Sequence, residues 1–137
     1  MVGGDKLRSA GIYPRCVVCA DNVTNNRPAP EMNEECMRQS GLCLRPSGCR
    51  CRGKVFIFDD TVRGCQAAAA AKGVALGVTT YSSQLELWKY ANVAPEAFAL
   101  CKAREESRLR HRMFAEGRAD RVISGWSELA RLLVNYC

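Results

Sequence analysis

The chain has 137 residues, 47% hydrophobic and 25% charged, and its 20 basic against 14 acidic side chains give a formal net charge of +6. This length suits one domain or two very small ones. No apolar run approaches the ~20 residues that a membrane-spanning helix needs, and Met1–Lys6 lacks the apolar centre of a secretory signal. We therefore expect a protein without membrane contact in a reducing intracellular compartment, the cytoplasm or the nucleus.

The first predicted unit, residues 1–54, is rich in cysteine and in turn-forming residues. It has too few large apolar side chains to bury a core, so burial alone would not offset the entropy lost on ordering it. A bound metal ion would supply the missing free energy. Within this unit we expect one short helix over residues 31–39, directly after Pro30.

The second predicted unit, residues 55–137, begins with an apolar run of strand type at residues 55–58. The next helix should run through Lys72, with Gly73 just past its end. Residues 74–78 fit a strand or a turn. Side-chain oxygens for the helix N-cap are offered by three consecutive residues, Asp59, Asp60 and Thr61.

Three more helices are expected towards the end of the chain. Ser82 can cap the first, and Pro95 suits the first turn of a long second helix that ends near Gly117. The last should run from about Asp120 or Ser124 to Tyr136, because its apolar residues recur at helical spacing. The predicted fold is α+β, mostly α, with a zinc-stabilised N-terminal loop module packed on a small C-terminal helical bundle.

Nine cysteines are an unusually high number for this length, and six of them fall within 36 residues. In a reducing compartment, clustered cysteines are more often metal ligands than disulfides. Cys16 and Cys19 form a C-x-x-C pair, whose tight turn lets both sulfurs reach one tetrahedral zinc ion. The predicted metal ligands are Cys16, Cys19, Cys36, Cys43, Cys49, Cys51 and Cys65.

The sequence leaves open which cysteines share an ion and whether one or two zinc ions bind. The pair at Cys16 could be completed by Cys36 and Cys43 or by Cys49 and Cys51. Seven thiolates are one short of two four-cysteine sites, so a carboxylate or a shared thiolate would have to complete the second. The alternatives are buried reduced cysteines, disulfides, or a redox dithiol without the usual strand-and-helix context.

No catalytic constellation stands out, and we predict a protein that is not an enzyme and has no small-molecule substrate. The run 56–61 resembles a phosphatase strand that ends in an aspartate nucleophile. That chemistry needs a second acid two residues after the first, where Thr61 and Val62 stand, so helix capping is the preferred interpretation. His111 is the single histidine, which makes serine–histidine catalysis improbable.

Basic residues gather in two places, one between the cysteines and one on the long helix. A four-thiolate zinc site would lower the net charge from +6 to +4, so the basic character is modest. We predict non-catalytic binding of nucleic acid through phosphate contacts; the alternative is a structural or adaptor subunit of a larger protein or ribonucleoprotein assembly. The predicted contacts are Arg45, Arg50, Arg52, Lys54, Lys102, Arg104, Arg108 and Arg112.

Overall fold

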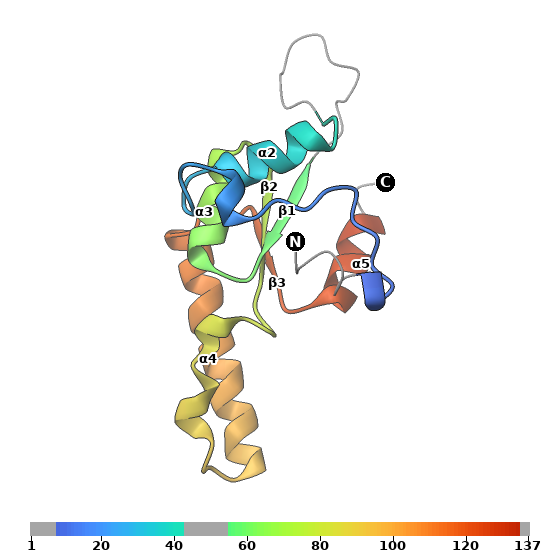
Figure 1. The fold of residues 1–137 in the computed structure, drawn as a ribbon. Coiled ribbons are helices and arrows are strands. Elements are labelled where there is room, and N and C mark those ends of the chain that lie inside the picture. Colours follow the sequence, from blue (N-terminus) through green and yellow to red (C-terminus); the bar gives the residue numbers. More distant parts are fainter. Residues whose placement is uncertain (1–7, 43–54, 135–137) are drawn as a thin grey trace.

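The structure, a computed structural model, describes residues 8–42 and 55–134 (Figure 1). In the first of these ranges, the short 3-10 turn η1 (Ala20–Asn22) precedes helix α2 (Glu31–Gln39). In the second, strands and helices alternate in the order β1 (Phe56–Asp59), α3 (Val62–Ala70), β2 (Val74–Val78), α4 (Pro95–Ala115), β3 (Arg121–Ile123) and α5 (Trp126–Val134). The fold is therefore mixed α and β, with more helix than strand.

The three strands form one parallel sheet in the order β1-β2-β3. Phe56 pairs with Val74 in the first ladder, and Leu76 pairs with Arg121 in the second. Parallel neighbours need a crossover between them, and α3 and α4 provide the two crossovers. As a result, the carboxyl ends of all three strands meet at one edge of the sheet.

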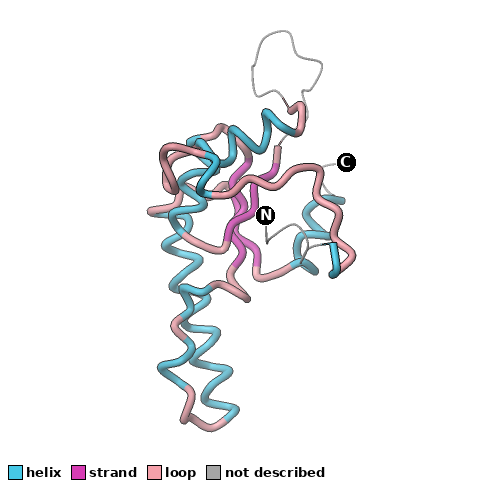
Figure 2. Tube along the Cα trace, viewed as in Figure 1, coloured by secondary structure: helices cyan, strands magenta, loops and turns pink. Residues whose placement is uncertain are grey.

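Helices lie on both sides of this sheet (Figures 1 and 2). Helix α3 packs against β1 and β2, and α4 packs against β3 and α3, whereas α5 lies across the sheet from them. The aromatic rings of Phe58 and Trp126 have centroids 5.7 Å apart and join β1 to α5. The far end of α4 extends beyond the sheet, and the 3-10 turns η2 (Ser83–Leu85) and η3 (Leu87–Tyr90) run beside it.

The core lies between the sheet and helices α3 and α4. Its centre is built by Cys65, Leu109, Met113 and Val122, all of them buried. Gly77 of β2 allows the close approach of α4, because a Cβ atom there would lie 2.6 Å from the Met113 sulfur. Among the described residues, no helix is long and apolar enough to cross a membrane.

Several predicted elements are confirmed. Helix α2 has the expected bounds, and α4 begins at Pro95 and ends two residues before Gly117. The strand predicted at residues 55–58 is β1, and the ambiguous residues 74–78 form β2. These elements begin beside prolines or consist of compact apolar runs, so local sequence largely determines them.

Other expectations are wrong, and each has a physical reason. Helix α3 ends at Ala70 because Lys72 takes a left-handed φ of 60°. The helix expected from Ser82 is replaced by two 3-10 turns, since Glu86 also has a left-handed φ, 46°. Of the two starts considered for the last helix, Asp120 is wrong, because residues 121–123 pair with β2 as strand β3. The other, Ser124, lies two residues before α5 begins at Trp126. Residues 55–134 thus form a three-stranded parallel sheet covered by helices, and not a helical bundle.

Candidate anion-binding cavity

The candidate site lies where the strands end. Strand β1 ends at Asp59, next to the first turn of α3, and β2 and β3 end at Val78 and Ile123 beside it. Open parallel sheets bind their ligands outside the carboxyl ends of the strands, where helix N-termini also point. This edge is therefore the first place to look for a functional site.

Asp59 provides a buried carboxylate at this edge, with only 7% of its side chain exposed. Its Oδ2 atom pairs with Arg27 Nη1 at 3.0 Å, and its Oδ1 atom accepts hydrogen bonds from the backbone N–H and the hydroxyl of Thr61 at 2.9 and 2.7 Å. Gly64 makes room for this carboxylate, because a Cβ atom there would lie 1.8 Å from Asp59 Cγ. The carboxylate thus fixes Arg27, which comes from a distant part of the chain, against the first turn of α3.

The N-terminus of α3 is capped by side chains from two segments. The Thr61 hydroxyl accepts a hydrogen bond from the Gly64 N–H at 2.9 Å, and the Gln84 side-chain oxygen accepts one from the Val62 N–H at 3.1 Å. The sequence predicted Asp59, Asp60 or Thr61 as the cap, and Thr61 takes this role. The Gln84 oxygen accepts in this cap, and the NH₂ group of the same side chain can donate to a ligand.

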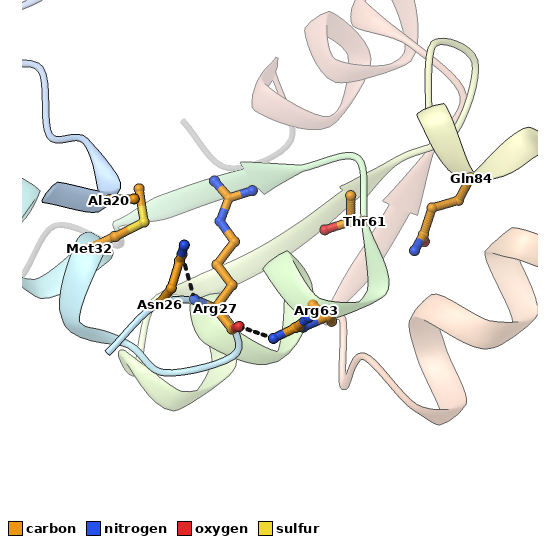
Figure 3. A pocket seen from close by; sticks show the side chains of 7 residues that line it. All are labelled: Ala20, Asn26, Arg27, Met32, Thr61, Arg63 and Gln84. Atoms are coloured by element: carbon orange, nitrogen blue, oxygen red, sulfur yellow. Dashed lines mark hydrogen bonds between the residues drawn. The ribbon is translucent and has the colours of Figure 1, made fainter. Parts of the chain in front are cut away.

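A cavity of about 510 Å³ opens beside this helix terminus (Figure 3). Two of its lining residues carry guanidinium groups, and none carries a carboxylate. Arg63 donates a hydrogen bond to the backbone carbonyl of Arg27, so the two arginines are linked (Figure 3). The lining consists of Ala20, Asn26, Arg27, Met32, Thr61, Arg63 and Gln84.

A second cavity, of about 300 Å³, shares Gln84 with the first but has a different charge pattern. Glu105 is buried there and accepts hydrogen bonds from the Tyr90 hydroxyl at 2.8 Å and from Arg108 at 3.1 Å. Glu86 and Arg112 line it as well, so acids and bases alternate. Because its charges compensate one another, this second cavity is less suited to binding an anion.

The predicted nucleic-acid contacts of α4 are mostly paired with acids three or four residues further along or back in the chain. Arg108 lies 3.1 Å from Glu105, and Arg112 lies 3.0 Å from Glu116. The Lys102–Glu106 pair is longer, at 3.8 Å, and Arg104 is exposed. The remaining predicted contacts lie outside the described residues: Arg45, Arg50, Arg52 and Lys54.

Two of the predicted metal ligands come together in the structure. The sulfurs of Cys16 and Cys36 lie 3.4 Å apart, and the Ser40 hydroxyl lies 3.2 Å from the Cys16 sulfur. Burial and the neighbouring Cys16 thiol raise the pKa of Cys36. Cys19 is exposed. The described residues contain no group of three or more histidine, cysteine or acidic side chains placed to hold a metal.

The other predicted ligands lie elsewhere. Cys65 belongs to α3 and is fully buried in the core; burial, together with the nearby carboxylates of Asp59 and Asp60, raises its pKa to about 12. A thiol with this pKa stays protonated at neutral pH unless a metal displaces the proton. Three cysteines lie outside the described residues: Cys43, Cys49 and Cys51. Zinc binding therefore stays a prediction.

No protein-family model matches this chain, and no curated protein sequence matches it significantly. The functional argument therefore depends on the site itself. Sequence reasoning had not selected Arg27, Arg63 or Gln84. One signal could have found them. Short apolar runs alternate with helices, a pattern that indicates a parallel sheet and directs attention to the polar residues that follow each strand.

Proposed function

We propose that this chain binds a small anionic ligand with a phosphate group in the cavity beside the N-terminus of α3. One observation carries the proposal: a cavity of ligand size whose charged lining residues are both arginines, Arg27 and Arg63. Its volume of about 510 Å³ falls within the ~300–1,000 Å³ that small-molecule sites occupy. No sequence comparison bears on this proposal. It differs from the sequence-based prediction of nucleic-acid binding by a protein with no small-molecule substrate.

The polar groups of the lining suit phosphate recognition. A guanidinium group presents paired N–H donors that match two phosphate oxygens. Arg27 is already held by Asp59, so a ligand would not have to order this long side chain. The positive end of the α3 dipole adds to the attraction. Because Asp59 offsets one of the two guanidinium charges, one full positive charge remains for the ligand.

Nucleic acid would present the same phosphate chemistry, and the predicted binding through α4 is a competing outcome. Three of the α4 basic residues pair with Glu105, Glu106 and Glu116, and the basic partner of each pair is at least partly exposed. Such pairs are weak and can open at little cost, but their carboxylates would still repel a phosphate backbone. The cavity is favoured because no lining residue is acidic and the Asp59 carboxylate beside it is neutralised by Arg27, which leaves the charge of Arg63 for the ligand. The adaptor role in a larger assembly also stays a prediction.

Isothermal titration calorimetry with inorganic phosphate and with a nucleoside monophosphate tests the proposal. Arg63→Gln should weaken binding ~10–100-fold, because a hydrogen bond to a charged group contributes ~1.5–3 kcal/mol. Arg131→Gln is the matched control, since this exposed α5 residue does not line the cavity. Equal affinity of the Arg63 and Arg131 variants would contradict the proposal.

A parallel titration with an oligonucleotide distinguishes a small phosphate ligand in the cavity from nucleic acid bound to α4. Arg104 is exposed on α4 and does not line the cavity. If Arg104→Gln weakens oligonucleotide binding while Arg63→Gln does not, the ligand is nucleic acid on α4. If the wild-type chain binds the mononucleotide and Arg63→Gln alone weakens it, the cavity is the site.

A further inference from the structure

Cys16 and Cys36 form a thiol pair that bridges two separate segments. Cys16 precedes η1 in the N-terminal segment, and Cys36 lies on α2. Their sulfurs are 3.4 Å apart, in van der Waals contact, so a small movement brings them to the ~2.0 Å of a disulfide bond. Neither residue is fully buried, which leaves the pair accessible to a small oxidant.

The segment between the two cysteines carries part of the candidate cavity. Asn26 and Arg27 both line it. The segment is folded back on itself, because the Glu31 carboxylate accepts hydrogen bonds from the Thr24 and Asn25 N–H groups at 3.0 and 2.8 Å. A covalent link between Cys16 and Cys36 would close the loop that holds Arg27.

We propose that Cys16 and Cys36 form a reversible disulfide that clamps residues 17–35 and presents Arg27 to the cavity in a fixed position. The effect on ligand affinity depends on the proposed function, whereas the disulfide and its effect on the loop do not. The clamp acts by removing conformational freedom from the loop. Asp59 holds only the guanidinium of Arg27, whereas the disulfide restrains the loop backbone that carries it. A ligand that contacts Arg27 then has less loop entropy to remove, so the oxidised form binds it more tightly.

The chemistry needs an oxidant of the low-molecular-weight disulfide class, such as oxidised glutathione. The thiolate of one cysteine attacks a sulfur of the oxidant, forms a mixed disulfide and releases one thiolate. The second cysteine then attacks the protein sulfur, which forms the Cys16–Cys36 bond and releases the second thiolate. The two cysteines lose two electrons and two protons, and the oxidant takes them up as two thiols.

The first test equilibrates the full chain with mixtures of oxidised and reduced glutathione and maps its disulfides by mass spectrometry without reduction. We expect a peptide that links Cys16 to Cys36 and a melting temperature raised by on the order of 10 °C relative to the reduced chain. Hydrogen exchange at residues 17–35 should slow. Cys36→Ser should abolish all three effects, and Cys101→Ser, in the separate helix α4, should leave them intact.

Three results would overturn the clamp. Linkage of Cys16 to Cys19, or of either residue to a cysteine elsewhere, would show that the observed contact does not select the bond. A Cys16–Cys36 bond without any change in melting temperature or exchange would show that it constrains nothing. Zinc that remains bound to Cys16 in the glutathione mixtures and prevents the bond would assign these sulfurs to a metal.

The second test compares phosphate affinity in the two redox states. Several-fold tighter binding by the oxidised chain supports the full proposal. Equal affinity in both states overturns the regulation of the cavity. Absence of phosphate binding in both states overturns the proposed function, while the melting temperature and the hydrogen exchange still report on the clamp.

Discussion

Gly64→Ala is the substitution that most directly tests how the cavity edge is built. The new methyl group would lie 1.8, 1.9 and 2.2 Å from Cγ, Oδ1 and Oδ2 of Asp59, so the carboxylate has to move. Its bonds to Arg27 and Thr61, of 2.7 to 3.0 Å, would then break. No backbone strain is involved, because Gly64 does not take a left-handed φ.

The expected cost follows from these contacts. A hydrogen bond to a charged group contributes ~1.5–3 kcal/mol, and the Asp59 carboxylate is too buried for water to replace all of the lost bonds. Alanine regains up to ~1 kcal/mol over glycine through helix propensity. We therefore expect Gly64→Ala to lower the free energy of unfolding by about 2–4 kcal/mol.

Urea unfolding of four proteins measures this effect: wild type, Gly64→Ala, Asp59→Ala and the double variant. Without the Asp59 carboxylate the new methyl group has space, so Gly64→Ala should be neutral or slightly stabilising in that background. The coupling energy, which is the difference between these two effects of Gly64→Ala, should be about 2–5 kcal/mol. Gly125→Ala is the control, because its Cβ would meet no atom closer than the Thr80 hydroxyl oxygen at 3.9 Å. Equal costs of Gly64→Ala with and without Asp59 would refute the reasoning.

Two further predictions concern the cysteines. Burial, with Asp59 and Asp60 nearby, raises the folded-state pKa of Cys65 from 9.0 to about 12, so the folded chain holds this proton more tightly than the unfolded chain. The resulting stability is present below pH 9 and is lost between pH 9 and about 12. The urea midpoint of the wild type should therefore fall with pH in this range, and Cys65→Ala should make that fall less steep. An equally steep fall in the variant would contradict the prediction. If the predicted zinc site exists, native mass spectrometry of the reduced chain will find one or two ions, and Cys19→Ser will lower that number; a metal-free chain that stays folded in chelator would refute it.

The sequence was sufficient for elements whose start or composition is locally determined. Helix α2 follows Pro30, helix α4 begins at Pro95, and β1 is a compact apolar run. It was insufficient for β3, which has three residues and owes its strand conformation to pairing with β2. Asp120, directly before β3, is also held by residues distant in sequence. Its N–H donates to the Ala75 carbonyl at 2.9 Å, and its carboxylate accepts a hydrogen bond from the Ala75 N–H at 2.8 Å.

The candidate cavity was harder to predict, because its parts come from distant segments. Asp59 looked like a helix cap, which is the usual role of an aspartate before a helix. Its partner Arg27 sits in a turn-rich stretch with no local feature that points to an anion. The two meet because α2 packs on α3 and brings the preceding loop to the end of β1. Only a prediction of the parallel sheet could have drawn attention to this edge.

Net charge and the density of basic residues along the sequence were also poor guides to the candidate site. The net charge of +6 suggested an acidic partner, and the long helix held one of the two clusters of basic residues. In the structure, acids one helical turn away pair with Arg108 and Arg112. Arg27 and Arg63 are only two residues, but they line the same open cavity, and no other lining residue is charged. The position of individual basic side chains relative to acids therefore says more about the local electrostatic field than the net charge does.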